Sequence, residues 1–372
     1  MKIFKYLTIA IAFLGTPGGI HIAMAQQEPI HAKGYAVMDN HSKLVPYNFD
    51  RRPVGNRDIL VKILYCGICH SDIHEAANDW NYTSYPNVPG HEMVGKVIQI
   101  GKDVTRFRKD DYIGVGGTVT SCGECEMCKS GKEQLCTAPP VPHADYPILL
   151  GGYSNKIVVD ERYGIHIPEG APIERIGPLM CAGITTYSPL KATVKKGDKV
   201  AIAGFGGLGH MGVQFAVALG ADVIVFDIAE DKREMALEFG AKKYVNVSHP
   251  EELSGVTERF DYILTTIPTG YDLNPYLNLL KPEGELLIVG LPALKDAFMI
   301  DVHSMPFGTR ISKWLMGGIK ETQEMVDFSI EHHILPEVKV IPVQQVNEAF
   351  QSVKEGKVHF RYVIDMNTLN EE

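Results

Sequence analysis

The sequence predicts a two-domain α/β protein, in which a strand-rich lobe is followed by a doubly wound parallel sheet. Length is the first observation, because 372 residues with 45% hydrophobic content exceed what one compact core usually holds. The second is a change of pattern near residue 198, where short β-branched segments give way to alternating strands and helices. Such alternation is typical of a parallel sheet.

The amino-terminal segment predicts a secretory signal peptide. Lys2 and Lys5 precede the apolar stretch 6–14, and small residues end at Ala25, after which we expect cleavage. The stretch is too short for a membrane span, which needs about twenty apolar residues. We therefore expect an exported, periplasmic protein. The alternative is that translation starts at Met24, which would give a cytoplasmic one.

Overall charge narrows the class of partner. The formal net charge is −9 and no Lys/Arg-rich run is present. These features argue against nucleic acid and an anionic membrane surface as partners. A small-molecule ligand is the remaining expectation.

Short segments in the first half of the chain predict a small barrel-like sheet. Residues 59–64 and 94–100 are rich in β-branched side chains and are bounded by Gly, Pro, Asn or Asp. Gly90 and Gly95 bracket His91, so that the backbone turns tightly and brings an imidazole into a cleft.

Three residues supply ligand types that suit zinc. Cys69 and His91 are 22 residues apart (91 − 69), enough for a strand and a return loop, and Cys181 is the only cysteine after residue 136. Three protein ligands with an open fourth position are typical of a catalytic zinc. Our hypothesis is that these three residues form such a site.

Polar residues near these ligands are candidate catalytic groups. Glu92 would contact or exchange with an inner ligand, or else be an acid satisfied by a nearby Arg or backbone amide. Asp72 would accept a hydrogen bond from the ring of His91. Ser71 and His74 would carry a proton from the metal to solvent, with a solvated surface histidine as the alternative.

Cys122, Cys125, Cys128 and Cys136 form the most specific pattern in the chain, with two, two and seven residues between them. A loop of this kind encloses a tetrahedral structural zinc. An iron–sulfur cluster and a pair of disulfides are the alternatives.

Residues 204–209 predict a dinucleotide-binding turn, because they follow the apolar strand 199–203 and precede a helix over 211–219. The glycines admit a pyrophosphate close to the backbone and aim the helix dipole at it. The residues of this turn are Gly204, Phe205, Gly206, Gly207, Leu208 and Gly209. Further strands are expected at 262–265 and 286–289, with a turn at 282–284 between helix and strand.

Asp227 ends the next strand, 222–227, where a carboxylate holds both ribose hydroxyls. NAD is therefore favoured over NADP. A 2′-phosphate would meet Asp227 and Glu230, although Lys232 and Arg233 would offset that repulsion.

Six segments carry a family resemblance. They are Gly-Ile-Cys69-His70-Ser71-Asp72, Pro89-Gly90-His91-Glu92, Ser121-Cys122-Gly-Glu-Cys125-Glu-Met-Cys128-Lys-Ser-Gly, Met180-Cys181-Ala-Gly-Ile-Thr, Gly204-Phe-Gly206-Gly-Leu-Gly209-His-Met-Gly and Asp272-Leu-Asn-Pro-Tyr-Leu-Asn-Leu-Leu. Together they resemble the zinc-containing medium-chain alcohol dehydrogenases, and within them the cinnamyl alcohol dehydrogenase-like branch. The resemblance covers nearly all of residues 30–366.

The resemblance implies a discontinuous GroES-like catalytic domain, a Rossmann domain and a homodimer. The expected divisions are a signal peptide at 1–25, a first catalytic part at 26–181, the NAD(P)-binding domain at 182–318 and a second catalytic part at 319–372.

It also implies roles for individual residues. A catalytic zinc would be held by Cys69, His91 and Cys181, and a structural zinc by the four cysteines 122, 125, 128 and 136. The proton relay would run through Ser71 and His74. The resemblance further places His70 and Lys232 at the cofactor, Arg361 near its pyrophosphate, and Trp80, Tyr82, Leu315 and Met316 around the substrate.

Two positions depart from the branch. Its members usually prefer NADP and have hydroxyl and basic residues where this chain has Asp227-Ile-Ala-Glu230, and they have Gly-Ser in place of Lys313-Trp314. A signal peptide is also unlike the family.

The expected activity is reversible hydride transfer between a primary alcohol (aromatic, allylic or medium aliphatic) and NAD(P). A zinc polyol or formaldehyde-type dehydrogenase is the alternative within enzymes. A non-catalytic exported dinucleotide- or zinc-binding protein is the alternative of another class, and metal analysis with an alcohol-dependent absorbance assay separates them. Surface positions are expected for His31, His143, His332 and His333.

Overall fold

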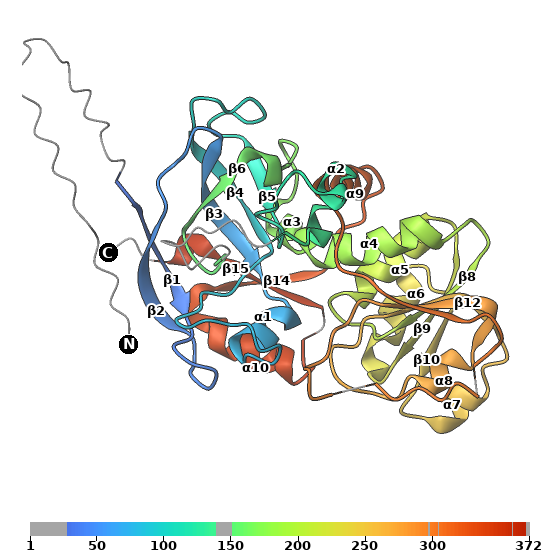
Figure 1. Ribbon diagram of the computed structural model, residues 1–372. Helices are drawn as coiled ribbons and strands as arrows, with labels where there is room; N and C mark the ends of the chain where they lie inside the picture. The colour runs from blue at the N-terminus through green and yellow to red at the C-terminus, as the bar shows by residue number, and fades with distance from the viewer. Residues whose placement is uncertain (1–27, 139–150, 297, 304, 359, 370–372) are drawn as a thin grey trace, which may run out of the picture.

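A computed structural model describes residues 28–138, 151–296, 298–303, 305–358 and 360–369 of the chain. The expected signal peptide and His143 lie outside the described residues. Two lobes lie side by side, one built on a mainly antiparallel sheet and the other on a parallel sheet (Figure 1).

The first lobe is a seven-stranded sheet with the strand order β14-β15-β3-β4-β5-β7, in which β6 also pairs with β3. Its strands are β3 (Asp58–Gly67), β4 (Met93–Ile100), β5 (Tyr112–Val115), β6 (Lys156–Asp160), β7 (Ile165–His166), β14 (Val338–Pro342) and β15 (Arg361–Asp365). A separate ribbon is formed by β1 (Ile30–Ala36) and β2 (Val45–Arg51).

The last strand of the described residues, β15, belongs to the same sheet as β3 from the first part of the chain. β15 pairs antiparallel with β3, and β14 lies outside it in a parallel pair. The short helices α1 (His70–Ala76) and α10 (Val346–Lys354) contact one another at this end of the lobe. Residues from both ends of the sequence therefore share one sheet.

The second lobe is a six-stranded parallel sheet with the order β10-β9-β8-β11-β12-β13. Its strands are β8 (Lys199–Ala203), β9 (Asp222–Asp227), β10 (Lys243–Asn246), β11 (Phe260–Thr265), β12 (Leu280–Ile288) and β13 (Arg310–Lys313). The order reverses between β8 and β11. In sheets of this kind ligands bind beyond the carboxyl ends of the strands at such a reversal, and the glycine-rich turn 204–209 directly follows β8.

Helices cover the parallel sheet and connect its strands. They are α5 (Gly209–Ala218), α6 (Arg233–Glu238), α7 (Pro250–Ser254) and α8 (Asn274–Leu277). The expected helix over 211–219 is α5, which begins two residues earlier, directly at the last glycine of the turn.

The prediction of a turn at 282–284 is wrong. These residues lie inside β12, which starts at Leu280. The pairing with β11 jumps between Phe260↔Leu280 and Tyr262↔Glu285, and Glu283 adopts φ 63°. The turn-forming residues therefore make an irregularity within the strand, because β11 and β12 already pair at Leu280.

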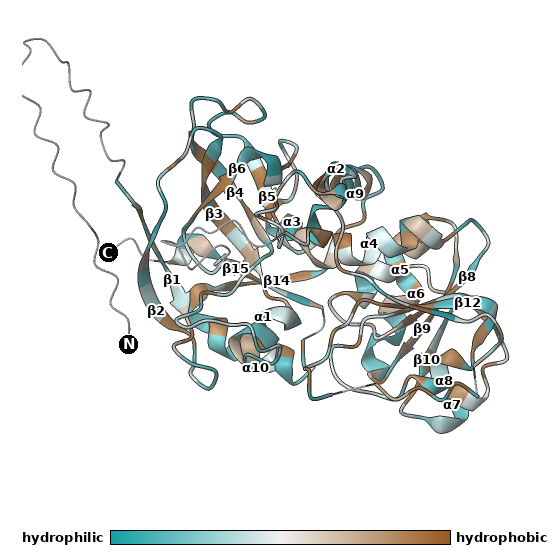
Figure 2. Cartoon of the chain, in the orientation of Figure 1, coloured by the Kyte–Doolittle hydropathy of each residue, from teal (hydrophilic) through white to brown (hydrophobic). Residues whose placement is uncertain are grey.

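The lobes meet across α4 (Ala182–Thr193) and α9 (Ile319–Glu331), which contact each other. Residues 182–190 of α4 are all buried. Figure 2 shows the apolar residues concentrated on the strands inside both lobes. The shorter helices α2 (Glu126–Lys129) and α3 (Ile173–Ile176) belong to the first lobe. In the part of the chain that the structure describes, no helix has the length and apolar character to span a membrane.

Candidate active site

The three ligands of the expected catalytic metal converge from distant parts of the chain. Cys69 immediately precedes α1, His91 lies just before β4, and Cys181 immediately precedes α4. The Sγ atoms of Cys69 and Cys181 lie 3.9 Å apart. One ligand atom from each of Cys69, His91, Glu92 and Cys181 lies within 4.8 Å of the others, and all four residues are buried.

This donor set fits zinc. Zn–S bonds of about 2.3 Å in a tetrahedron place two sulfurs about 3.8 Å apart, close to the 3.9 Å observed. A disulfide would need about 2.05 Å. The Cys181 thiol donates a hydrogen bond to Cys69 and holds the pKa of Cys69 well below its usual range, so this pair carries one of the thiolates that a metal requires.

Asp72 orients two of the ligands. Its Oδ1 lies 2.9 Å from Nδ1 of His91, the contact expected from the sequence. Its Oδ2 accepts hydrogen bonds from the Cys69 backbone N–H at 2.9 Å and from the Tyr153 hydroxyl at 2.8 Å. Because Asp72 occupies Nδ1 of His91, Nε2 is the nitrogen left to bind a metal.

Glu92 is held by a buried arginine. Its Oε1 accepts a hydrogen bond from Nη2 of Arg361 at 2.5 Å, while its Oε2 has no hydrogen-bond partner. Burial raises the pKa of Glu92 to about 8, against the opposing effect of Arg361. The structure thus shows the acid satisfied by an arginine, and one of its carboxylate oxygens also belongs to the metal-type cluster; its exchange as a metal ligand stays a prediction.

Arg361 lies between the metal-type cluster and the glycine-rich turn. Its guanidinium donates to the Ile68 carbonyl at 3.1 Å, and its Cδ would lie 2.9 Å from a Cβ added to Gly207. Its Nε is buried without a partner. A buried, unpaired N–H beside a glycine-rich turn fits a site for an anion.

The turn itself has room for a dinucleotide. Gly204 adopts φ 89°, which favours glycine. A Cβ added to Gly206 would have no atom within 4 Å, so the backbone there is open to a close ligand. At Gly209 an added Cβ would lie 1.9 Å from the Gly204 carbonyl oxygen, which explains why the last glycine is needed to pack the start of α5. The residues of the turn thus fit a dinucleotide pyrophosphate.

Asp227 ends β9 beside this turn. Its carboxylate accepts hydrogen bonds from the backbone N–H groups of Phe205 and Ala229, the second at 2.9 Å. Lys232 is buried. Arg233 is engaged by Glu230 and by Glu252 through ion pairs of 2.5 and 3.2 Å.

The two residues of the expected relay are placed differently. Ser71 Oγ lies 3.4 Å from Cys69 Sγ. His74 is buried rather than a solvated surface histidine, with Nδ1 2.7 Å from Asp79 and Nε2 3.1 Å from the Pro268 carbonyl. Both positions of the ring therefore face acceptors. Within the described residues, no hydrogen bond joins Ser71 to His74.

Aromatic rings extend from His74. His70 and Trp80 lie 5.0 and 5.1 Å from it, and Tyr82 stacks on Trp80 at 5.9 Å. Burial lowers the pKa of His70 to about 4, so its ring is neutral at pH 7. Trp80 donates its indole N–H to the Pro292 carbonyl at 3.0 Å.

Leu315 and Met316 follow β13. Leu315 is half exposed, and Met316 adopts φ 45°. The pair Lys313-Trp314, which stands where the branch has Gly-Ser, precedes them. Lys313 is exposed, and Trp314 is half-buried and donates its indole N–H to the Ser312 hydroxyl at 3.0 Å.

The second cysteine cluster also fits zinc. Its Sγ atoms lie 3.8 Å (Cys122–Cys128), 3.5 Å (Cys125–Cys128), 3.9 Å (Cys125–Cys136) and 3.6 Å (Cys122–Cys136) apart. These distances match the edges of a zinc–thiolate tetrahedron and exceed a disulfide bond. The backbone N–H groups of Cys125 and Glu124 lower the pKa of Cys122 to about 6.

Sequence reasoning missed several partners. Tyr153 and Pro268 meet the site only through the fold, 81 and 194 positions from the residues that they contact. The same holds for the contact of Glu92 with Arg361, which joins residues 269 positions apart. Asp79 is only five residues after His74, yet sequence reasoning gave it no role. His210 is buried, 3.1 Å from the Gly206 carbonyl through Nδ1, and accepts the Glu337 N–H at 3.2 Å through Nε2.

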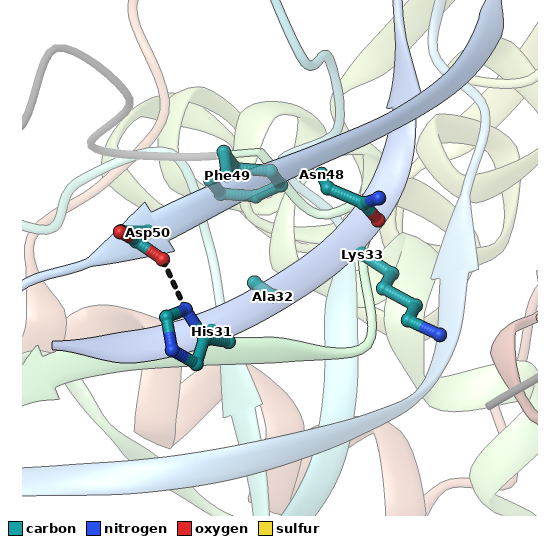
Figure 3. Close-up of a pocket in the computed structure, with 6 residues that line it drawn as sticks. All are labelled: His31, Ala32, Lys33, Asn48, Phe49 and Asp50. Atoms are coloured by element: carbon teal, nitrogen blue, oxygen red, sulfur yellow. Dashed lines mark hydrogen bonds and ion pairs between the residues drawn. The ribbon is translucent and has the colours of Figure 1, made fainter. Parts of the chain in front are cut away.

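His31, His332 and His333 lie on the surface, as expected. His31 pairs with Asp50 at 2.5 Å in a pocket on the β1–β2 ribbon (Figure 3). The other residues lining this pocket are Ala32, Lys33, Asn48 and Phe49. None of the six residues belongs to the site described above.

Comparisons with known proteins agree with this geometry. The model of the Alcohol dehydrogenase GroES-like domain matches residues 55–169, and that of Zinc-binding dehydrogenase matches residues 207–331. The chain is 45% identical over 335 residues to the Probable formaldehyde dehydrogenase AdhA of Bacillus subtilis (strain 168), covering 88% of this chain and 95% of the relative. It is 42% identical over 352 residues to Cinnamyl alcohol dehydrogenase 2 of Rauvolfia serpentina, covering 92% and 97%. The crystal structure of CAD from Helicobacter pylori complexed with NADP(H) is 46% identical, with a TM-score of 0.87 over 91% of this chain and 99% of that one.

Proposed function

This chain belongs to the zinc-containing medium-chain alcohol dehydrogenases, and from that premise we propose how its residues divide the reaction. The protein is a zinc-dependent NAD(P) alcohol dehydrogenase of the cinnamyl alcohol dehydrogenase-like group, acting on alcohols and aldehydes. The observation that carries our proposal is the convergence of Cys69, His91 and Cys181 beside Arg361 and the glycine-rich turn.

The site residues would hold zinc and NAD(P) and move a proton. When bound, zinc supplies a Lewis acid that lowers the pKa of an alcohol hydroxyl, and the oxidised nicotinamide supplies the hydride acceptor. Ser71, beside Cys69, is placed to take the hydroxyl proton. His74 would pass it on, through a bridging hydroxyl or water because the two side chains do not contact each other. Because Nδ1 faces Asp79 and Nε2 faces the Pro268 carbonyl, this role requires the ring to leave the carbonyl so that Nε2 can accept the proton. The products are an aldehyde, reduced cofactor and one proton.

Substrates of this enzyme would be primary alcohols with an aromatic, allylic or medium aliphatic chain. The stacked rings of Trp80 and Tyr82, continuing from His74, support this proposal, since aromatic faces bury apolar substituents well. Formaldehyde is the second candidate, favoured by the similarity to AdhA.

We propose that NAD is preferred over NADP. The carboxylate of Asp227 is fixed at the end of β9 by two backbone N–H groups, where it would repel a 2′-phosphate. Arg233 is already paired with Glu230 and Glu252 and so offers little compensation.

A homodimer through β13 is a further proposal. β13 forms the outer edge of the parallel sheet in the described residues. In the segment that precedes β13, Met299, Val302 and Phe307 are 80%, 73% and 95% exposed. An open strand edge, preceded in the chain by large exposed apolar side chains, favours pairing with a second copy. A monomeric mass in solution would contradict this.

Export also remains a proposal, supported by the basic and apolar pattern of residues 1–25. Sequencing the amino terminus of the native protein tests it. A start at Gln26 supports export, whereas a start at Met24 supports a cytoplasmic enzyme.

The decisive experiment is a steady-state panel of alcohols and aldehydes, including formaldehyde and a hexitol, with both nicotinamide cofactors. We expect the highest kcat/KM with an aromatic or allylic alcohol and NAD. Two zinc ions per chain with no turnover on any member of the panel would instead support a non-catalytic zinc- or dinucleotide-binding protein.

A further inference from the structure

The segment 122–136, which carries the four cysteines and is called here the four-cysteine lobe, contacts the start of α9 directly. Oε2 of Glu133, which lies between Cys128 and Cys136, accepts the backbone N–H of Ile319 at 3.1 Å. A Cβ added to Gly318 would lie 1.8 Å from the Gly131 carbonyl oxygen. The two backbones are thus in close contact, and Figure 1 shows α2 of the lobe beside α9. Glu133 satisfies an N–H that the first turn of a helix leaves unpaired.

The segment that reaches α9 carries two of the substrate-lining candidates. Five residues, 314–318, separate β13 from α9. The near end is held by the Trp314 N–H on the Ile288 carbonyl at 2.9 Å, and the far end by Glu133. Leu315 and Met316 lie between these two anchors, so movement of the far anchor must displace them.

Met316 needs such support. Its φ of 45° lies in the left-handed region, which a non-glycine residue adopts only when its surroundings hold it there. Its Sδ would lie 3.1 Å from a Cβ added to Gly117, so the side chain packs closely over that glycine.

The first turn of α9 is also joined to the helix behind the metal-type cluster. Glu321 accepts a hydrogen bond from the Ser188 hydroxyl of α4 at 3.0 Å, and α4 begins immediately after Cys181. The first turn of α9 therefore links the four-cysteine lobe to the element that carries a proposed zinc ligand.

We propose that Glu133 is a positioning residue for substrate selectivity, through which the four-cysteine lobe sets the place of Leu315 and Met316. This inference rests on the proposed function, and it takes Leu315 and Met316 as the substrate-lining residues that the family resemblance implies. Glu133 acts through the Ile319 N–H and is not among the residues assigned to substrate or cofactor.

The test compares E133A with E133Q, because the amide oxygen of glutamine still accepts the Ile319 N–H. E126A is the matched control, since Glu126 is an exposed glutamate of the same lobe. Each purified holoenzyme is assayed for zinc content, for NADH affinity by fluorescence, and for kcat/KM with an aromatic allylic alcohol and with ethanol.

We expect E133A to change the aromatic-to-ethanol ratio of kcat/KM by about tenfold, the scale of one lost helix-cap hydrogen bond. Two zinc ions per chain and the NADH affinity should be unchanged, and E133Q and E126A should match the wild type. An unchanged ratio in E133A, or an equal change in E126A, overturns the inference while leaving the proposed function intact. A wild type that oxidises no alcohol overturns the proposed function and the inference with it.

I319P tests the same contact from the other side and decides the matter should E133A fail to fold. Proline is well tolerated at the first position of a helix and removes the N–H that Glu133 accepts. It also replaces the Ile319 side chain, which packs against two hydrophobic clusters, so I319A, which keeps the N–H, is its matched control and should match the wild type. Gly318, with φ −71° and ψ 171°, already has a backbone conformation compatible with a following proline. I319P should shift the ratio in the same direction as E133A, and wild-type selectivity in I319P overturns the inference.

Discussion

Substituting Asp72 by asparagine tests how the protein holds its catalytic zinc. The fully buried carboxylate receives four donors, namely His91 Nδ1 at 2.9 Å, the Gly90 N–H at 3.1 Å, the Cys69 N–H at 2.9 Å and the Tyr153 hydroxyl at 2.8 Å. An asparagine side chain of the same shape offers one acceptor oxygen, so its NH2 group must face either the Cys69 N–H or the Gly90 N–H.

Each orientation leaves one buried N–H unpaired, at a cost of about 1–3 kcal/mol. If the NH2 group faces His91 and Gly90, the histidine loses its acceptor; in the other orientation it keeps a neutral amide oxygen in place of a carboxylate. Mutation of the group that orients a ligating histidine typically lowers metal affinity about 10–100-fold, or about 1.4–2.8 kcal/mol. D72N should therefore release one zinc ion per chain much faster than the wild type, while the four-cysteine zinc stays bound.

The assay follows zinc release to a chromogenic chelator, with the slower structural ion as an internal standard. Y153F is the control, because it removes one donor and keeps the contact of Asp72 with His91. NADH affinity should be unchanged in both variants. Equal release rates for wild type and D72N would refute the argument that Asp72 fixes the ligand geometry.

Three further predictions follow from the same geometry. H91A and C69A should abolish alcohol turnover but retain NADH binding by fluorescence, and activity equal to wild type in either would mean that the zinc assignment is wrong. D227S should raise the ratio of kcat/KM with NADP to that with NAD, by about tenfold or more if removing one charge repulsion is worth about 1.4 kcal/mol; a variant that still rejects NADP counts against the role of that carboxylate. Burial lowers the pKa of His210 to about 3 from an ordinary 6.5, so the unfolded chain takes up this proton first and the folded state loses stability as pH falls below 6.5. The loss approaches about 1.4 kcal/mol per pH unit for one proton. Urea titrations at pH 7 and pH 5 should therefore show that the free energy of unfolding changes less with pH in H210N than in the wild type. An equal change in both proteins would contradict this.

Local patterns predicted the central strands β8 and β9 of the parallel sheet, part of β11 and β12, and neither β10 nor β13. The apolar run at β8 and the run ending in Asp227 at β9 match the observed strands residue for residue, because a buried parallel strand is a continuous apolar segment. The pattern failed at 282–284, where Pro, Glu and Gly lie inside β12. Pairing with β11 overrode turn preference there.

The two metal-type clusters were predictable because cysteine spacing is informative. The hydrogen-bond partners around them were not. The pairing of Glu92 with Arg361 depends on β15 lying next to β3, which no local pattern specifies. The same is true of the contact between His74 and the Pro268 carbonyl, which joins the two lobes across 194 positions. Contacts of this kind arise from topology, and a single sequence without structure does not contain them.

The active site of this enzyme is complete only when β15 has paired with β3. Arg361 must reach Glu92, 269 positions earlier in the sequence, and the turn at Gly207 before the reaction centre is complete. Without residues 361–365, β3 would lose its pairing with β15 and the buried Glu92 would lose its guanidinium partner. Pairing of β15 with β3 should therefore be a condition for catalysis as well as for folding, and a variant that lacks these five residues should be inactive.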